Sequence, residues 1–313
     1  MKKTNYAEIP SLSEINMGVG ASSWGDRVMW NYGRSFCYED IKSAFEVSIE
    51  EGIRFVDTAE VYGRGQSERL LGQFIKDRKG PVIVATKFFP FPWRWNEKSL
   101  LSALRHSLER LKLEAVDLYQ IHVPLPPIPI ETWMKGLAEA VHQGLVHSVG
   151  VSNYDGTQML RAYTALARYN IQLSSNQVLY HLLDREVEKN GLLGRCQELG
   201  IRLIAYSPLA QGLLTGKYTL ENLPPSIRHR RFRFTLTKIQ PLLKLMIEIG
   251  QDHGGKTNSQ VALNWLINKG ALPIPGAKNA QQARQNAGAL GWQLTSEQIN
   301  ALDEMSDSIH QQN

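Results

Sequence analysis

Four side chains that can donate, accept or stabilise a proton follow short apolar segments in the first half of the sequence. Asp57, Lys87 and His122 each end a run of β-branched and other apolar residues, and Tyr62 lies in the loop after Asp57. This set is suited to delivering a proton to a carbonyl oxygen. A free tyrosine has a pKa of about 10, so we expect the Lys87 ammonium to lower the pKa of Tyr62. We expect Asp57 to hold Lys87, and His122 to orient the substrate oxygen.

The chemistry implied by these residues needs a partner that the side chains cannot supply. No side chain donates hydride, so carbonyl reduction here requires a nicotinamide cofactor. Each residue also has an ordinary structural explanation, such as a helix-capping aspartate, a solvated lysine, a hydrogen-bonded rim histidine or a loop aromatic. The coincidence of all four at the ends of consecutive apolar segments favours a shared site.

The elements that must position these residues alternate along the chain. Short strands are expected over 15–21, 53–57, 82–87, 116–122, 146–152, 173–178, 201–207 and 271–274. Amphipathic helices separate most of them, and strict alternation predicts a parallel sheet. Eight such units predict one (β/α)8 barrel domain over residues 1–313, with the active site at its C-terminal face. That face collects the strand ends, and so the four proton-handling residues.

Composition excludes several classes of protein. The 313 residues are 42% apolar and 21% charged, which is ordinary globular composition. Two cysteines, Cys37 and Cys196, are too few for a disulfide framework. No signal peptide or membrane span is apparent, so we expect a cytoplasmic protein with no membrane partner. The net charge of +5 is weak grounds for a nucleic-acid partner. Histidines do not occur at metal-ligand spacing with cysteines or carboxylates, so we expect no metal.

Three further motifs allow a second interpretation. Gly250–Thr257 matches a phosphate-binding loop for ATP or GTP, but helical spacing before it favours a connection between two helices. The segment Pro124–Pro129 contains a P-x-x-P spacing, for which a stiff strand-to-helix loop is favoured over a peptide ligand. The Arg228–Arg233 cluster contains interleaved phenylalanines; we favour a loop over an anionic cofactor rather than a nucleic-acid site.

Several motifs together resemble one known family over essentially the whole chain. They are Gly52–Ala59, Tyr62-Gly63, Ser67-Glu68, Leu71-Gly72, Ser152-Asn153, Gln177, Ala205–Leu209 and Ile274–Asn279. This pattern resembles the aldo-keto reductase superfamily. The last segment is similar to plant and cyanobacterial members, a group that includes pyridoxal-reductase-like proteins. The resemblance implies a (β/α)8 barrel that binds NADPH without a dinucleotide-binding domain.

The resemblance also implies a role for individual residues. Tyr62 is the expected proton donor, with Asp57, Lys87 and His122 completing a catalytic tetrad. Ser152, Asn153 and Gln177 are expected to hold the cofactor's carboxamide, and Tyr206 to stack on its nicotinamide ring. The pyrophosphate is expected along Ser207, Leu209, Gln211, Gly212 and Lys217. The adenosine is expected among Gly276, Lys278, Gln282 and Asn286, with Lys278 as partner of the 2′-phosphate.

The substrate end of the site is less sharply defined by the sequence. Trp24 is expected to line the pocket and to approach the cofactor, and Phe88 is expected to contact the substrate together with Tyr62 and His122. Phe89, Trp93 and Trp95 either form an apolar wall with Phe88 or plug their loop onto the barrel. The function that we expect from these residues and from the family resemblance is NADPH-dependent reduction of an aldehyde or ketone. The alternative is a cofactor-bound redox sensor on the same fold, which the potassium-channel β-subunits resemble.

Overall fold

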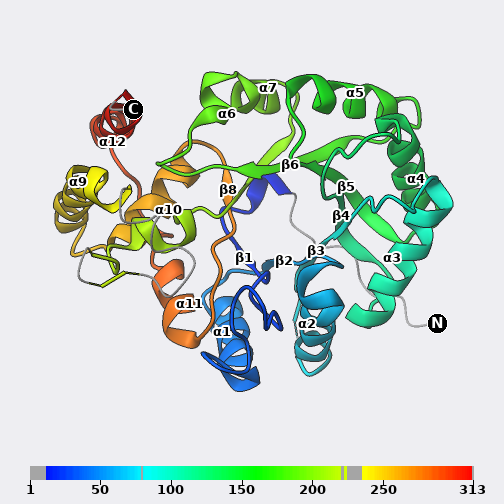
Figure 1. Ribbon diagram of the computed structural model, residues 1–313, viewed down its shortest axis with the longest axis horizontal. Helices are drawn as coiled ribbons and strands as arrows, with labels where there is room; N and C mark the ends of the chain where they lie inside the picture. Colours follow the sequence, from blue (N-terminus) through cyan, green and yellow to red (C-terminus); the bar gives the residue numbers. More distant parts are fainter. Residues whose placement is uncertain (1–11, 79, 220–221, 224–234, 312–313) are drawn as a thin grey trace.

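Eight parallel strands lie in the centre of the molecule and helices surround them (Figure 1). The computed structural model describes residues 12–78, 80–219, 222–223 and 235–311. The Arg228–Arg233 cluster lies outside the described residues. Neighbouring strands follow one another in sequence order, and the circle is completed where Gly20 forms a parallel bridge with Gly276. The predicted (β/α)8 barrel is therefore confirmed.

The strands are short, and each pairs in parallel with the next. They are β1 (Gly18–Gly20), β2 (Phe55–Asp57), β3 (Ile83–Phe88), β4 (Val116–Ile121), β5 (Val146–Ser152), β6 (Leu173–Leu179), β7 (Arg202–Tyr206) and β8 (Leu272–Pro273). All eight lie within or beside the predicted segments. Strands β1, β2 and β8 are shorter than expected. Beyond β8, the Gly20 N–H donates to the Pro275 carbonyl oxygen and Gly20 bridges Gly276.

Helices lie between consecutive strands and continue after the last one. They are α1 (Tyr38–Glu50), α2 (Gln66–Lys76), α3 (Glu97–Leu111), α4 (Ile130–His142), α5 (Gly156–Ala167), α6 (Glu186–Lys189), α7 (Leu192–Glu198), α9 (Gln240–Asp252), α10 (Asn258–Asn268), α11 (Ala280–Ala287) and α12 (Ser296–Gln311). Short 3-10 turns are η1 (Leu12–Glu14), η2 (Tyr62–Gly65) and η3 (Ala210–Thr215). In Figure 1, α9 and α12 lie together at one side of the barrel.

The helix ends follow the capping residues that the sequence contains. The Asn96 side chain accepts a hydrogen bond at the start of α3, and Thr257 and Gln260 form the predicted capping box of α10. The Gly250–Thr257 segment therefore joins α9 to α10, with a helix before it where a phosphate-binding loop has a strand. The nucleotide-loop interpretation is wrong for this reason.

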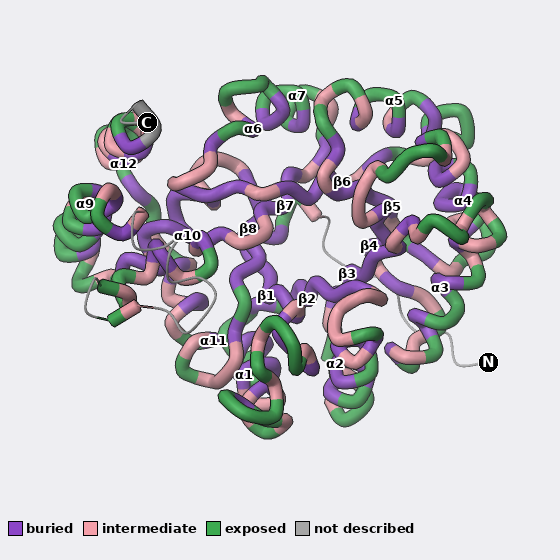
Figure 2. Tube along the Cα trace, viewed as in Figure 1, coloured by how far each residue is buried: buried purple, intermediate pink, exposed green. Residues whose placement is uncertain are grey.

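The strands are buried along almost their whole length (Figure 2), and successive side chains belong to different clusters. Phe55, Ile83 and Leu118 belong to a cluster inside the barrel, whereas Val56 and Val84 belong to the larger cluster between the strands and the helices. Because successive side chains point to opposite faces, every second residue of a strand enters the barrel. By the same alternation, the polar side chains of Asp57 and Lys87 point into the barrel near the carboxyl ends of β2 and β3.

Helices α2 and α3 approach closely at Gly72, and this contact yields a prediction. A Cβ atom on Gly72 would lie 2.6 Å from the Leu111 carbonyl oxygen and 2.7 Å from that of Arg110. Backbone atoms at a helix end cannot move aside easily, so we expect Gly72→Ala to destabilise the protein by about 1–3 kcal/mol.

Chemical denaturation of the two proteins measures this difference. A matched control is Gly194→Ala, because a Cβ atom on this α7 glycine would meet nothing within 4 Å. We expect that control to be neutral or to stabilise by about 0.5–1 kcal/mol through helix propensity. Equal effects at the two positions would contradict the steric explanation.

Candidate active site

A buried ion pair lies at the carboxyl end of the barrel. The Lys87 Nζ atom donates to Asp57 Oδ1 at 2.5 Å and to the Thr58 carbonyl oxygen at 2.9 Å. The Lys87 and Asp57 side chains are 0% and 2% exposed. Burial acts to lower the pKa of Lys87, but the nearby Asp57 and Tyr62 side chains outweigh it, so the pKa lies above its ordinary value. Lys87 therefore carries its charge throughout the physiological pH range, and its predicted pairing with Asp57 is confirmed.

Tyr62 lies against this pair in the η2 turn. The Lys87 Nζ atom is 5.1 Å from the centroid of the Tyr62 ring. Burial raises the pKa of Tyr62, the Lys87 charge lowers it, and the Asp57 charge raises it, with a net increase above 10.0. Lysine acts in the predicted direction, but the expectation of a net decrease is wrong because desolvation of the phenolate is the larger effect. Tyr62 is therefore a neutral phenol, the form that can donate a proton.

His122 lies beside Tyr62, directly after β4. The two rings meet edge to face with centroids 5.8 Å apart. Burial, reinforced by the Lys87 charge, lowers the pKa of His122 to about 3. Its Nδ1 atom is buried and has no hydrogen-bond partner within the described part of the chain. The imidazole is therefore neutral at physiological pH, and such a ring donates through one nitrogen and accepts through the other.

The depressed pKa of His122 has a measurable effect on stability. The folded protein binds this proton near pH 3 and the unfolded chain near pH 6.5, so the unfolded state gains protons first as the pH falls. The contribution of neutral His122 is complete above pH 6.5 and is lost as the pH falls toward 3. We expect wild type to lose about 1–2 kcal/mol more than His122→Gln between pH 7 and pH 5. Denaturation of both proteins at the two pH values measures this, and equal losses would contradict the shift.

Asn153 connects the tetrad to the residues expected to hold the cofactor. Its amide nitrogen donates to the His122 carbonyl oxygen at 3.0 Å and to Ser152 Oγ at 3.1 Å. The Tyr206 hydroxyl donates to Asn153 Oδ1 at 3.0 Å. Asn153 has a φ of 61°, in the left-handed region that asparagine tolerates better than most residues. The structure thus brings these residues together at the ends of β4, β5 and β7.

Gln177 joins the same network from the inside of the barrel. Its amide nitrogen donates to Asp57 Oδ2 at 2.8 Å, and its carbonyl oxygen on the backbone accepts from Ser152 Oγ at 2.8 Å. Gln177 is only 2% exposed. Gln177 therefore supports the Asp57 carboxylate directly.

The residues expected to hold the pyrophosphate and the adenosine occupy two stretches of the same rim. The pyrophosphate stretch begins directly after β7 and ends two residues after η3; it comprises Ser207, Leu209, Gln211, Gly212 and Lys217. Backbone φ angles of 52° at Ser207, 55° at Gln211 and 99° at Gly212 turn this stretch sharply. After β8, the Gln282 side chain accepts from the Lys278 backbone N–H at 2.9 Å. The Asn286 amide donates to the Gly276 carbonyl oxygen at 3.3 Å.

Lys278 is the cation expected beside a 2′-phosphate, and aromatic rings surround it. Its Nζ atom lies 4.6 Å from the centroid of Trp30 and 4.9 Å from that of Phe36. Both rings belong to the connection between β1 and α1. Lys278 therefore makes cation–π contacts with two rings of this connection.

Two residues expected in the substrate pocket lie elsewhere. Trp24 and Phe88 are both 0% exposed. Trp24 packs edge to face between Phe45 of α1 and Phe74 of α2, and its Nε1 atom donates to the Ala277 carbonyl oxygen. Phe88 follows the inward-pointing Lys87 and therefore faces outward, toward α4. The structure corrects both expectations, because neither side chain presents surface to a ligand.

Gln120 is a residue of the site that the sequence motifs did not indicate. Its amide nitrogen lies 3.4 Å from Asp57 Oδ2, and its oxygen lies 3.4 Å from Ser175 Oγ. A signal was present, since Gln120 precedes His122 by one strand period and so shares its face. We expect Gln120 to limit the number of orientations open to the Asp57 carboxylate.

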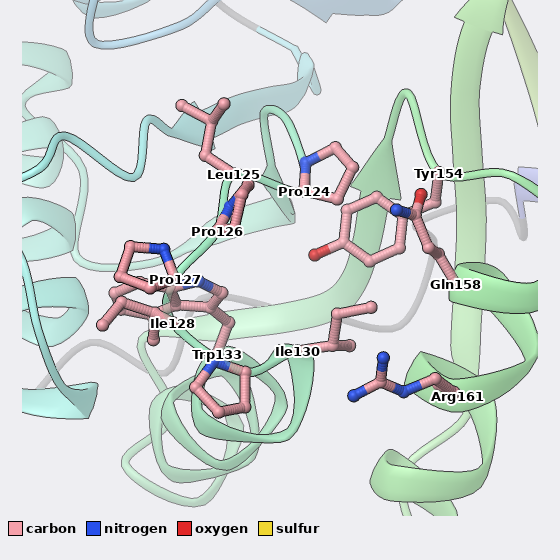
Figure 3. Close-up of a pocket in the computed structure, with 11 residues that line it drawn as sticks. Pro124, Leu125, Pro126, Pro127, Ile128, Ile130, Trp133, Tyr154, Gln158 and Arg161 are labelled. Atoms are coloured by element: carbon pink, nitrogen blue, oxygen red, sulfur yellow. The ribbon is translucent and has the colours of Figure 1, made fainter.

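A cavity of about 390 Å³ lies beside this site and not in it. Figure 3 shows the Tyr154 ring between the proline segment after β4 and helix α5. None of the four tetrad residues lines the cavity, whose walls are the 124–130 segment, Trp133, Tyr154, Gln158 and Arg161. The P-x-x-P residues form the stiff strand-to-helix connection favoured by the sequence.

A parallel barrel whose rim carries a phenol, an imidazole and a buried lysine–aspartate pair is the arrangement of a barrel-type carbonyl oxidoreductase. The model of the aldo/keto reductase family matches residues 16–307, and the chain belongs to this family. Among the described residues, no helix is long and apolar enough to cross a membrane.

Named relatives and a solved structure are similar to this chain over most of its length. The chain is 41% identical to the chloroplastic pyridoxal reductase of Arabidopsis thaliana over 92% of this chain and 82% of that one. It is 32% identical to L-glyceraldehyde 3-phosphate reductase of Escherichia coli over 84% and 82% of the two chains. A crystal structure of an aldo/keto reductase from Klebsiella pneumoniae with NADP and acetate has a TM-score of 0.74 at 28% identity, covering 93% and 91%.

Proposed function

We propose that the protein reduces an aldehyde or ketone to an alcohol with NADPH, and that Tyr62 donates the proton. The observation that carries this proposal is the charged Lys87–Asp57 pair buried directly against a neutral Tyr62. A chain in which these groups served only stability would not need a phenol against this ion pair and an imidazole against the phenol. Membership of the aldo/keto reductase family supports the same reaction.

The chain's own residues account for the handling of the proton. NADPH, when bound, supplies the hydride that reaches the carbonyl carbon. The Tyr62 hydroxyl donates its proton to the carbonyl oxygen as negative charge develops there, and Lys87 stabilises the resulting phenolate. Neutral His122 donates a hydrogen bond that orients the same oxygen. Asp57 keeps Lys87 in place and is itself held by the Gln177 amide.

The residues present fit a nicotinamide dinucleotide. We propose that Ser152, Asn153 and Gln177 hold the carboxamide and that Tyr206 stacks on the nicotinamide ring. We propose that the pyrophosphate lies along five residues after β7 that are all partly or fully exposed. They are Ser207, Leu209, Gln211, Gly212 and Lys217. Lys278 would bind the 2′-phosphate, with Gln282 and Asn286 shaping the loop that carries it and Gly276.

A fluorescence titration with NADPH and NADH, followed by NADPH oxidation, tests the proposal. The aldehydes should include pyridoxal, because the Arabidopsis relative is named for it. We expect tighter binding of NADPH than of NADH and turnover of at least one aldehyde. Binding without turnover of any aldehyde or ketone would favour a redox sensor, and binding of neither nucleotide would contradict the proposal.

Three further predictions accompany this function: a single domain, a cytoplasmic location, and no nucleic-acid or membrane partner. The unbroken order of the eight strands supports residues 1–313 as one domain. A cytoplasmic location and the absence of nucleic-acid and membrane partners stay predictions. Measurement of the compartment in which the protein accumulates would test the predicted cytoplasmic location.

A further inference from the structure

A row of aromatic rings runs from the active site to the surface of the protein. The Phe89 ring lies 5.6 Å from the His122 ring and 4.7 Å from Phe91, measured between centroids. Phe91 and Trp93 are stacked at 4.7 Å with an interplanar angle of 5°. Trp93 is 68% exposed. We call Phe89, Phe91 and Trp93 the aromatic row.

The connection that carries this row has no strand or helix of its own, and Arg94 holds it. The Arg94 guanidinium donates to both carboxylate oxygens of Glu60, at 2.5 and 2.9 Å, and to the Phe89 carbonyl oxygen at 2.7 Å. Its Cζ atom lies over the Phe88 ring at 4.8 Å and over the Phe91 ring at 5.2 Å. One side chain thus fixes the backbone and two rings of the connection.

Glu60 connects this arrangement to the proton donor. It lies two residues before Tyr62, and its Oε1 atom also accepts from the Phe89 backbone N–H at 2.7 Å. The Glu60 and Arg94 side chains are 8% and 17% exposed. A paired guanidinium and carboxylate are coplanar and fix orientation as well as distance. The loop of Tyr62 and the aromatic row are therefore held to one another.

We propose that the Arg94–Glu60 pair is a positioning pair that sets the preference of this active site for planar aromatic carbonyl compounds over small aliphatic ones. The inference rests on the reductase function proposed above. A ring beside His122 adds stacking contacts to a flat aromatic substrate only if its orientation is fixed before binding. A small aliphatic aldehyde reaches Tyr62 and His122 without touching the row. Neither Arg94 nor Glu60 is expected to contact the reacting atoms.

The decisive measurement is the ratio of kcat/KM for an aromatic aldehyde, 4-nitrobenzaldehyde, to that for propanal. We expect Arg94→Met to lower this ratio about tenfold, the loss of roughly one ring-stacking contact, mainly by raising the KM of the aromatic substrate. Reduction of propanal should stay within about threefold of wild type. Arg94→Lys should not restore the ratio, because an ammonium cannot pair with both carboxylate oxygens.

Two further variants separate positioning from general damage. Arg161→Met is a control at another arginine–glutamate pair, in which Arg161 makes three hydrogen bonds to Glu131 between α5 and α4. It should leave the ratio unchanged. Phe91→Leu shortens the row and keeps the ion pair, so it should lower the ratio even if Arg94→Met fails to fold. Thermal unfolding and NADPH affinity report folding independently of activity.

The outcomes separate this inference from the proposed function. An unchanged ratio in folded Arg94→Met, or in Phe91→Leu, would overturn the inference. Equal loss toward both aldehydes would show a purely structural role and would overturn it as well. A wild-type protein that reduces propanal at least as well as 4-nitrobenzaldehyde would overturn the inference and leave the reductase function standing. Failure of wild type to reduce any aldehyde would overturn both.

Discussion

Replacing Tyr62 with phenylalanine is expected to lower kcat for carbonyl reduction by a factor of about 10²–10⁴, the usual contribution of a positioned general acid. The substitution removes one oxygen and keeps the ring, so the edge-to-face contact with His122 remains. NADPH affinity should change by no more than about twofold, because the hydroxyl acts on the carbonyl oxygen in the transition state. Steady-state kinetics and a fluorescence titration measure the two quantities.

Tyr206→Phe provides the comparison, because it removes the same oxygen from another tyrosine of the site. Its hydroxyl donates to Asn153 Oδ1 and does not belong to the tetrad. We expect a loss of about 2–10-fold, the cost of one hydrogen bond. If the two variants lost activity equally, or if Tyr62→Phe kept most of its turnover, Tyr62 would not be the proton donor.

Replacing Lys87 with methionine is expected to cost stability as well as activity. The Asp57 carboxylate is 2% exposed and would lose its only charged partner among the described residues, although the Gln177 amide would remain. Removing one member of a buried ion pair costs roughly 3–5 kcal/mol. The pKa of Tyr62 would rise further without the ammonium, because the Lys87 charge lowers it. Reduction should fall by about 10²-fold or more.

The double variant Asp57→Asn/Lys87→Met separates the two effects. A neutral amide needs no counter-ion, so we expect it to recover about 1–3 kcal/mol relative to Lys87→Met. Activity should stay low, because the ammonium beside Tyr62 is still missing. Denaturation curves and kcat measured on the same preparations test both statements. Recovery of activity together with stability would mean that Lys87 acts only through folding.

The wild-type pH profile should reflect these charges. His122 has a pKa of about 3, so its titration should leave reduction unaffected between about pH 6 and 9. The pKa of Tyr62 is above its ordinary value of 10.0, so activity should decline only on the alkaline side.

The amino-acid sequence by itself determined the alternation of elements and the residues at the strand ends. These features depend on local patterns, such as β-branched runs, helical spacing and the caps at Asn96 and Thr257. Parallel strands place their carboxyl ends at one face of the barrel. The position of Asp57, Lys87 and His122 at that face therefore follows from the pattern of strands along the sequence. The outward direction of Phe88 also follows from the alternation of side chains along β3.

Only the tertiary structure decided which side chains meet and how strongly burial acts on them. The net direction of the Tyr62 pKa depends on desolvation, which no sequence pattern measures. The contact between Gln177 and Asp57 depends on the closure of the barrel, since β2 and β6 are not neighbours. The Arg94–Glu60 pair joins two irregular connections, and such contacts carry no periodicity. Local interactions therefore set the elements, whereas non-local packing sets the chemistry of the site.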